Sequence, residues 1–97
     1  MKLFLVHCGF YDVDIGDGLY ESHMNFFVAA ESFEAARAKV KKIDLFQSKR
    51  MHVDGLQEIR AVDGFRIQLE ADLALNSQTE IINFKHRDLA PNPASKP

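Results

Sequence analysis

The sequence predicts an α+β fold: a mainly antiparallel sheet of about five strands, in the order β-β-α-β-β-β, with one helix packed on it. Three observations support this class. Apolar residues recur at every second position through most of the chain, which is the spacing of strands. Residues 33–43 instead repeat their apolar residues at helical spacing. The pair Asp63-Gly64 lies between two apolar runs and predicts a hairpin there.

The first strand is predicted over Lys2–Phe10. Apolar side chains occupy both of its faces: Leu3, Phe4, Leu5 and Val6. Such a strand belongs at the centre of a sheet that is covered on both sides. Tyr11–Leu19 follows it and is rich in Asp and Gly, which are residues typical of turns.

The second strand is predicted over Glu21–Ala30. Strict alternation gives this strand an apolar face, which consists of Met24, Phe26, Val28 and Ala30. The opposite face is mixed and contains Glu21, His23, Asn25, Phe27 and Ala29.

The only predicted helix covers residues 33–43. Ser32 is a natural N-cap, and Glu34 in the first turn interacts favourably with the helix dipole. The apolar stripe that should pack on the sheet consists of Phe33, Ala36, Val40 and Ile43. Residues 44–50 are predicted to be a connection without regular structure.

Three more strands are predicted, over Met51–Ala61, Phe65–Glu70 and Thr79–Lys85. For the hairpin between the first two, a two-residue loop would place Arg60 opposite Ile67 and mix charge with the core. A three-residue loop, residues 62–64, instead pairs apolar with apolar positions, so we expect this second register.

Length and composition fit one domain. The chain has 97 residues, of which 46% are hydrophobic and 27% charged. We expect a domain over 1–89 and a disordered tail over 90–97, where Pro, Asn and Ser dominate. The lone Cys8 excludes an internal disulfide and favours a reducing, cytoplasmic location. No run approaches the ~20 apolar residues of a membrane span, so we expect no membrane partner.

The charge pattern argues against nucleic acid. The formal net charge is −2, although residues 33–52 are locally basic. On a helix these cations spread around the polar face and do not form one stripe. Because the whole domain is acidic, we expect no nucleic-acid partner.

Candidate functional residues lie on two of the predicted strands. Glu21 and His23 are two positions apart, as are His52 and Asp54, so each pair shares a strand face. If the strands are neighbours, the four side chains converge. They would suit Zn²⁺ or another transition metal, or a small polar ligand. Alternatively, they hydrogen-bond to one another and hold the strands in place, so the sequence assigns them no metal or cofactor.

Catalytic motifs are absent from the sequence. It has no glycine-rich phosphate loop, no H-E-x-x-H and no G-x-S-x-G. His7 cannot serve as a base for Cys8, because neighbours on a strand point to opposite faces. We therefore assign no catalytic residue, and enzymatic activity stays undecided.

Two short elements carry a family resemblance. They are His52-Val53-Asp54-Gly55 and Val62-Asp63-Gly64-Phe65. Three segments come before them in the chain: Leu3 to Gly9, then Glu21-Ser22-His23, then the strand that runs into Ser32. In this order they resemble the family called domain of unknown function 1543, over about residues 1–70. The resemblance implies a small bacterial α+β domain without an assigned activity. Some relatives look like tandem copies, which implies that this single copy forms a homodimer.

Two functional hypotheses follow. The first is a cytoplasmic bacterial binding or interaction module that self-associates. The second is a small metal- or ligand-dependent enzyme whose site is formed by the two His and two carboxylates.

Overall fold

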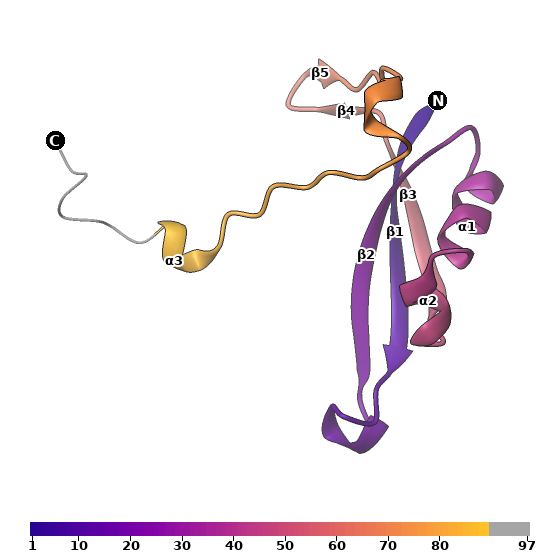
Figure 1. Ribbon diagram of the computed structural model, residues 1–97, viewed down its shortest axis with the longest axis vertical. Coiled ribbons are helices and arrows are strands. Elements are labelled where there is room, and N and C mark those ends of the chain that lie inside the picture. The colour runs from indigo at the N-terminus through magenta and orange to yellow at the C-terminus, as the bar shows by residue number, and fades with distance from the viewer. Residues whose placement is uncertain (90–97) are drawn as a thin grey trace, which may run out of the picture.

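The computed structural model describes residues 1–89. This part of the chain is α+β, as predicted, and its elements follow one another as Figure 1 shows: β1 (Lys2–Tyr11), β2 (Glu21–Ala30), α1 (Phe33–Lys41), α2 (Asp44–Ser48), β3 (His52–Ile59), β4 (Ala61–Val62), β5 (Phe65–Arg66) and α3 (His86–Leu89). Two 3-10 turns, at Gly16–Gly18 and Leu73–Leu75, lie in connections. The predicted disordered tail, 90–97, lies outside the described residues. Within 1–89, no helix is long and apolar enough to cross a membrane.

The main sheet has three antiparallel strands in the order β2-β1-β3. The first strand of the chain is therefore central, as its two apolar faces predict. The strands β4 and β5 form a separate two-stranded ribbon. The expected single sheet of about five strands is therefore wrong, and the predicted strand Met51–Ala61 is divided between β3 of the main sheet and β4 of the ribbon.

The core lies on one face of this sheet. Phe4, Val6 and Cys8 of β1 are fully buried there, against Ala36 and Val40 of α1. Helices α1 and α2 lie on this side of the sheet (Figure 1). On the opposite face, residues 69–81 cover only one end of the strands. The expected cover on both sides is therefore wrong for most of this second face, which we call the open face.

Helix α1 begins where the sequence predicts. The Ser32 hydroxyl accepts a hydrogen bond from the Ala35 amide at 3.1 Å, so Ser32 is the N-cap. The helix ends earlier than predicted, because Ile43 leaves the helical conformation (φ −70°, ψ 132°). A second short helix, α2, then replaces the predicted irregular connection. It buries Phe46, and this gain of apolar contact explains why the segment is ordered against the core.

The predicted hairpin register is wrong. Val62 pairs with Phe65 and Ala61 with Arg66, so the loop has two residues, and the Ile67 amide donates to the Arg60 carbonyl at 2.9 Å. Both loop residues have positive φ, 52° for the aspartate and 84° for the glycine, which is the geometry Asp-Gly favours in two-residue hairpins. The ribbon is exposed on both faces, so burial did not select its register.

The predicted fifth strand does not form within residues 1–89. Thr79–Lys85 has no strand partner and runs away from the sheet toward α3 (Figure 1). The predicted strand Phe65–Glu70 likewise ends at Arg66. The chain after the ribbon therefore adds little to the core.

Candidate metal centre

The structure brings the four candidate residues together on the open face. The Nε2 atom of His23 lies 3.0 Å from Oε1 of Glu21 and 3.5 Å from Oδ2 of Asp54. The Nε2 atom of His52 lies 3.1 Å from the same Oε1 and 3.0 Å from Oδ1 of Asp54. We call these four residues the His/carboxylate cluster.

The two contributing strands are not neighbours, contrary to the condition that the sequence suggested. The central strand β1 lies between them, and Gly9 of β1 pairs with His23 on one side and His52 on the other. A Cβ atom built on Gly9 would lie 2.6 Å from His52 Nε2 and 2.7 Å from Asp54 Oδ2, and it would also collide with Glu21. The cluster therefore closes over a position where the central strand has no side chain.

A β-bulge in β3 supplies the second carboxylate. His7 pairs with Gly55, but the next residue of β1, Cys8, pairs with Val53. Asp54 is thus the extra residue of the bulge. Alternation from His52 directs Asp54 to the open face, and the bulge resets the alternation beyond it. Bulges are frequent beside functional sites because they redirect a side chain in this way.

Electrostatics keep Glu21 ionised. A hydrogen bond with His52 is the largest cause that lowers the pKa of Glu21, and the charges of both cluster histidines lower it further. The Tyr11 hydroxyl also donates to Glu21 Oε2 at 3.3 Å. In turn, the Glu21 charge raises the pKa of Tyr11. The cluster therefore presents an anionic oxygen between two imidazoles.

A third histidine borders the cluster and was not among the candidates. The His7 ring stacks on the His23 ring, with centroids 4.9 Å apart and planes at 11°. Its Nδ1 lies 2.6 Å from the amide oxygen of Asn25. An amide oxygen only accepts hydrogen bonds, so in the neutral ring Nδ1 carries the proton and Nε2 keeps a free lone pair. The signal was in the sequence, since His7 and Gly9 are two positions apart on one strand face.

The pair of His7 and Cys8 behaves as predicted. The imidazole is exposed on the open face, whereas the thiol is fully buried in the core. Burial is the main cause that raises the pKa of Cys8. A buried thiol of this kind is a poor nucleophile, so its role is packing.

The donor set and spacing fit a transition-metal ion. Tetrahedral Zn²⁺ with bonds of ~2.0–2.1 Å holds its ligand atoms ~3.4 Å apart. The four distances between histidine nitrogens and carboxylate oxygens run from 3.0 to 3.5 Å, with the two histidines meeting different oxygens of Asp54. Two overlapping triplets have ligand atoms within 4.8 Å of one another: Glu21, His52, Asp54, and His7, His23, Asp54. An ion at the centre would replace the protons that otherwise hold the carboxylates and imidazoles together.

The chain matches a known protein family. A family model described as Domain of Unknown Function (DUF1543) matches residues 18–69. This segment contains all four residues of the cluster. Neither a curated protein nor a solved structure matches the chain.

Proposed function

The chain belongs to the DUF1543 family of domains of unknown function, and we propose that it binds a divalent transition metal such as Zn²⁺ through the His/carboxylate cluster. One observation carries this proposal: four metal-ligating side chains from both outer strands converge over a glycine of the central strand. Zn²⁺ and other divalent first-row transition metals are coordinated by both imidazole and carboxylate groups.

Stability alone does not account for the arrangement. Solvent-exposed ion pairs contribute about 0–1 kcal/mol each, so hydrogen bonds within the cluster add little to the fold. A glycine within a strand weakens that strand. The bulge at Asp54 interrupts the ladder on the other side of β1. Two local departures from regular sheet structure, the glycine and the bulge, thus meet at one point, which is typical of a functional site.

Access to solvent favours a catalytic form of metal centre. The side chains of the cluster are 31–48% exposed, so water can reach an ion bound there. Catalytic zinc sites keep a water molecule beside three protein ligands, whereas structural sites are closed by four. An ion held by Glu21, His52 and Asp54 would leave room for water, with His23 beside it. Such an ion acts as a Lewis acid and supplies hydroxide near neutral pH. With such an ion the chain would be a small metal-dependent enzyme, which is the second hypothesis drawn from the sequence.

Metal titration of the purified full-length chain tests the proposal. After treatment with a chelator, the protein is titrated with Zn²⁺ by calorimetry and with Co²⁺ by absorption spectroscopy. We expect one ion per chain, and at least a tenfold loss of affinity in His52→Ala and in Asp54→Asn. His86→Ala is the matched control, because His86 lies on α3 outside the cluster. Equal affinity in wild type and His52→Ala, or no binding at all, would refute the metal site.

Self-association is a second candidate function. The observation that favours it is the large apolar surface after the ribbon, where Leu73 and Ile82 are 94% and 96% exposed. Exposed apolar surface of this extent marks interaction sites. Light scattering over a concentration series tests this candidate, and a strict monomer at high concentration would count against it. The bacterial and cytoplasmic setting stays a prediction from the sequence and its family resemblance.

A further inference from the structure

The segment after the second 3-10 turn presents apolar side chains to solvent. We call residues 79–89 the C-terminal arm. In Figure 1 it runs from the top of the sheet to α3, away from the rest of the chain. Four large apolar side chains of the arm are exposed, by 58, 96, 68 and 66%: Ile81, Ile82, Phe84 and Leu89. Contiguous apolar surface that is exposed to water commonly marks a site that another surface covers.

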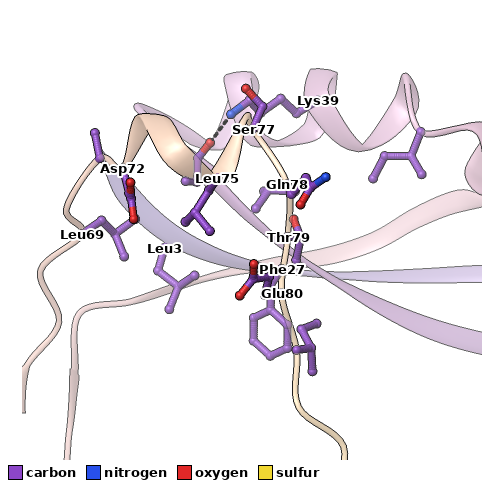
Figure 2. Close-up of a pocket in the computed structure, with 15 residues that line it drawn as sticks. Leu3, Phe27, Lys39, Leu69, Asp72, Leu75, Ser77, Gln78, Thr79 and Glu80 are labelled. Carbon is purple, nitrogen blue, oxygen red and sulfur yellow. Dashed lines mark hydrogen bonds between the residues drawn. The ribbon is translucent and has the colours of Figure 1, made fainter.

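A groove lies beside the base of the arm. It has a volume of about 690 Å³ and runs between one end of β2 and residues 69–81 (Figure 2). Its walls are mostly apolar and include Leu3, Phe27, Leu69 and Leu75. The arm itself contributes Thr79, Glu80 and Ile81 to one wall, but Ile82 and Phe84 do not line the groove.

The outer edge of β2 borders this groove. Within residues 1–89, β2 pairs only with β1, so the backbone groups of its other edge have no strand partner. At one end of this edge the Ala29 carbonyl accepts a hydrogen bond from the Lys39 ammonium. The rest of the edge is a template for a further strand. Thr79–Lys85 has the alternation of a strand, with Ile82 and Phe84 on one face.

The turn before the arm determines where the arm can bind. Asn76 and Ser77 both have positive φ, 49° and 62°, which is uncommon for residues other than glycine. This turn leads into residues 77–81, which line the groove beside β2, and the chain beyond them runs away from its own sheet toward α3 (Figure 1). To pair with its own β2, the chain would have to rebuild the turn, whereas a second copy can meet the arm in the observed conformation.

From these features we propose that two copies of the chain exchange their arms. Residues 79–85 of each copy add as a strand to the β2 edge of the other, and Ile82 or Phe84 enters the groove beside Phe27. The interface is symmetric, so each chain donates one arm and accepts one. The proposal rests on the self-association proposed above and specifies its mechanism. It is independent of metal binding.

The size of the interface is sufficient. Each arm presents four exposed large apolar side chains, and two exchanged arms together with the surface that they cover would approach the ~1,200–2,000 Å² of stable interfaces. Backbone hydrogen bonds to the β2 edge would give affinity, and the apolar side chains would give register.

Light scattering coupled to size exclusion tests the exchange on the full-length chain. We expect a mass of about 22 kDa for wild type, twice the 11.0 kDa of one chain. The double variant Ile82→Asp/Phe84→Asp should give the monomer mass. These side chains are exposed in the single chain, so the variant should keep its fold, which circular dichroism checks. Leu19→Asp is the control, since Leu19 is 76% exposed in a different loop and should leave the dimer intact.

Mixing two variants makes the test specific. The arm variant keeps an intact groove, and Phe27→Asp keeps an intact arm. Each alone should be monomeric, whereas an equimolar mixture retains one of the two contacts and should form a weaker heterodimer. A dimer that survives the double arm variant would overturn arm exchange and leave self-association standing. A monomeric wild type would overturn both, and amide exchange that shows 79–85 protected in that monomer would place the arm on its own β2.

Discussion

His23 and His52 reach the same carboxylate oxygen from opposite sides of the central strand. Their Nε2 atoms lie 3.0 and 3.1 Å from Oε1 of Glu21. The two imidazoles thus share one oxygen. The positive charge that balances this carboxylate comes either from a proton on an imidazole or from a bound metal ion.

Gly9 should matter for metal binding more than for stability. In Gly9→Ala, the new Cβ would press on the ends of flexible cluster side chains, which can move aside. We therefore expect a free energy of unfolding within about 1 kcal/mol of wild type, because alanine suits a strand at least as well as glycine. The affinity for Zn²⁺ should fall at least tenfold. Gly55→Ala is the control, since a Cβ there meets nothing within 4 Å. Similar affinities in the two variants would contradict the role of Gly9.

His7 should support the cluster from outside. Its ring stacks on His23 and its Nδ1 is held by Asn25. Removing the ring in His7→Ala should weaken Zn²⁺ binding by about 10- to 100-fold, as loss of an orienting partner or ligand does. Asn25→Ala keeps the imidazole and frees its orientation, so its effect should be smaller. Calorimetric titration measures both, and an unchanged affinity in His7→Ala would exclude His7 from the site.

The pH dependence of stability should report on Glu21. Its pKa is lowered from the ordinary value of 4.5, chiefly by the hydrogen bond with His52. A carboxylate with a depressed pKa stabilises the fold above its unfolded pKa, and this contribution disappears as the pH falls through the folded value. In metal-free protein, Glu21→Gln should therefore be less stable than wild type at pH 7, and the difference should shrink below about pH 4.5.

Urea unfolding at a series of pH values measures this difference. Glu31→Gln serves as the control, because Glu31 is an exposed acid outside the cluster. If wild type and Glu21→Gln lose stability in parallel down to pH 3, the carboxylate has no partner that favours its charged form.

Helix α2 should be a structural element and not a loop. Phe46 is 7% exposed and belongs to the core, whereas its neighbour Leu45 is 39% exposed. We expect Phe46→Ala to lower the free energy of unfolding by about 3–5 kcal/mol. Leu45→Ala should cost much less, because little of its contact area is buried. Chemical denaturation distinguishes the two, and equal costs would argue against the packing of α2.

Much of the candidate site could be predicted from the sequence, because strand alternation is a local property. The pairs Glu21/His23 and His52/Asp54 share a face for that reason alone. The sequence could not show that β1 lies between them, since strand order depends on pairing between distant segments. The roles of Gly9 and the bulge at Asp54 follow from that order and were missed with it.

The errors in the fold have physical causes of their own. The hairpin register was inferred from burial, but the ribbon of β4 and β5 buries neither face, so turn chemistry decided it. Residues 44–48 were too few to display helical periodicity, and one buried phenylalanine was enough to order them. The strand expected at Thr79–Lys85 has the right alternation but no partner within residues 1–89. Alternation predicts a strand conformation and not the presence of a neighbour.

The bulge in β3 also governs which length changes this strand can tolerate. Upstream of Gly55 the even-numbered residues face the cluster, and downstream the odd-numbered residues occupy that side. Losing one residue there, Asp54, would restore a regular ladder and leave Leu56 opposite Val6 in the core, but it would remove the second carboxylate from the cluster. One added residue would instead enlarge the bulge or turn Leu56 from the core toward the histidines. We therefore expect a deletion at Asp54 to keep the sheet while abolishing the cluster, and an insertion to disturb both.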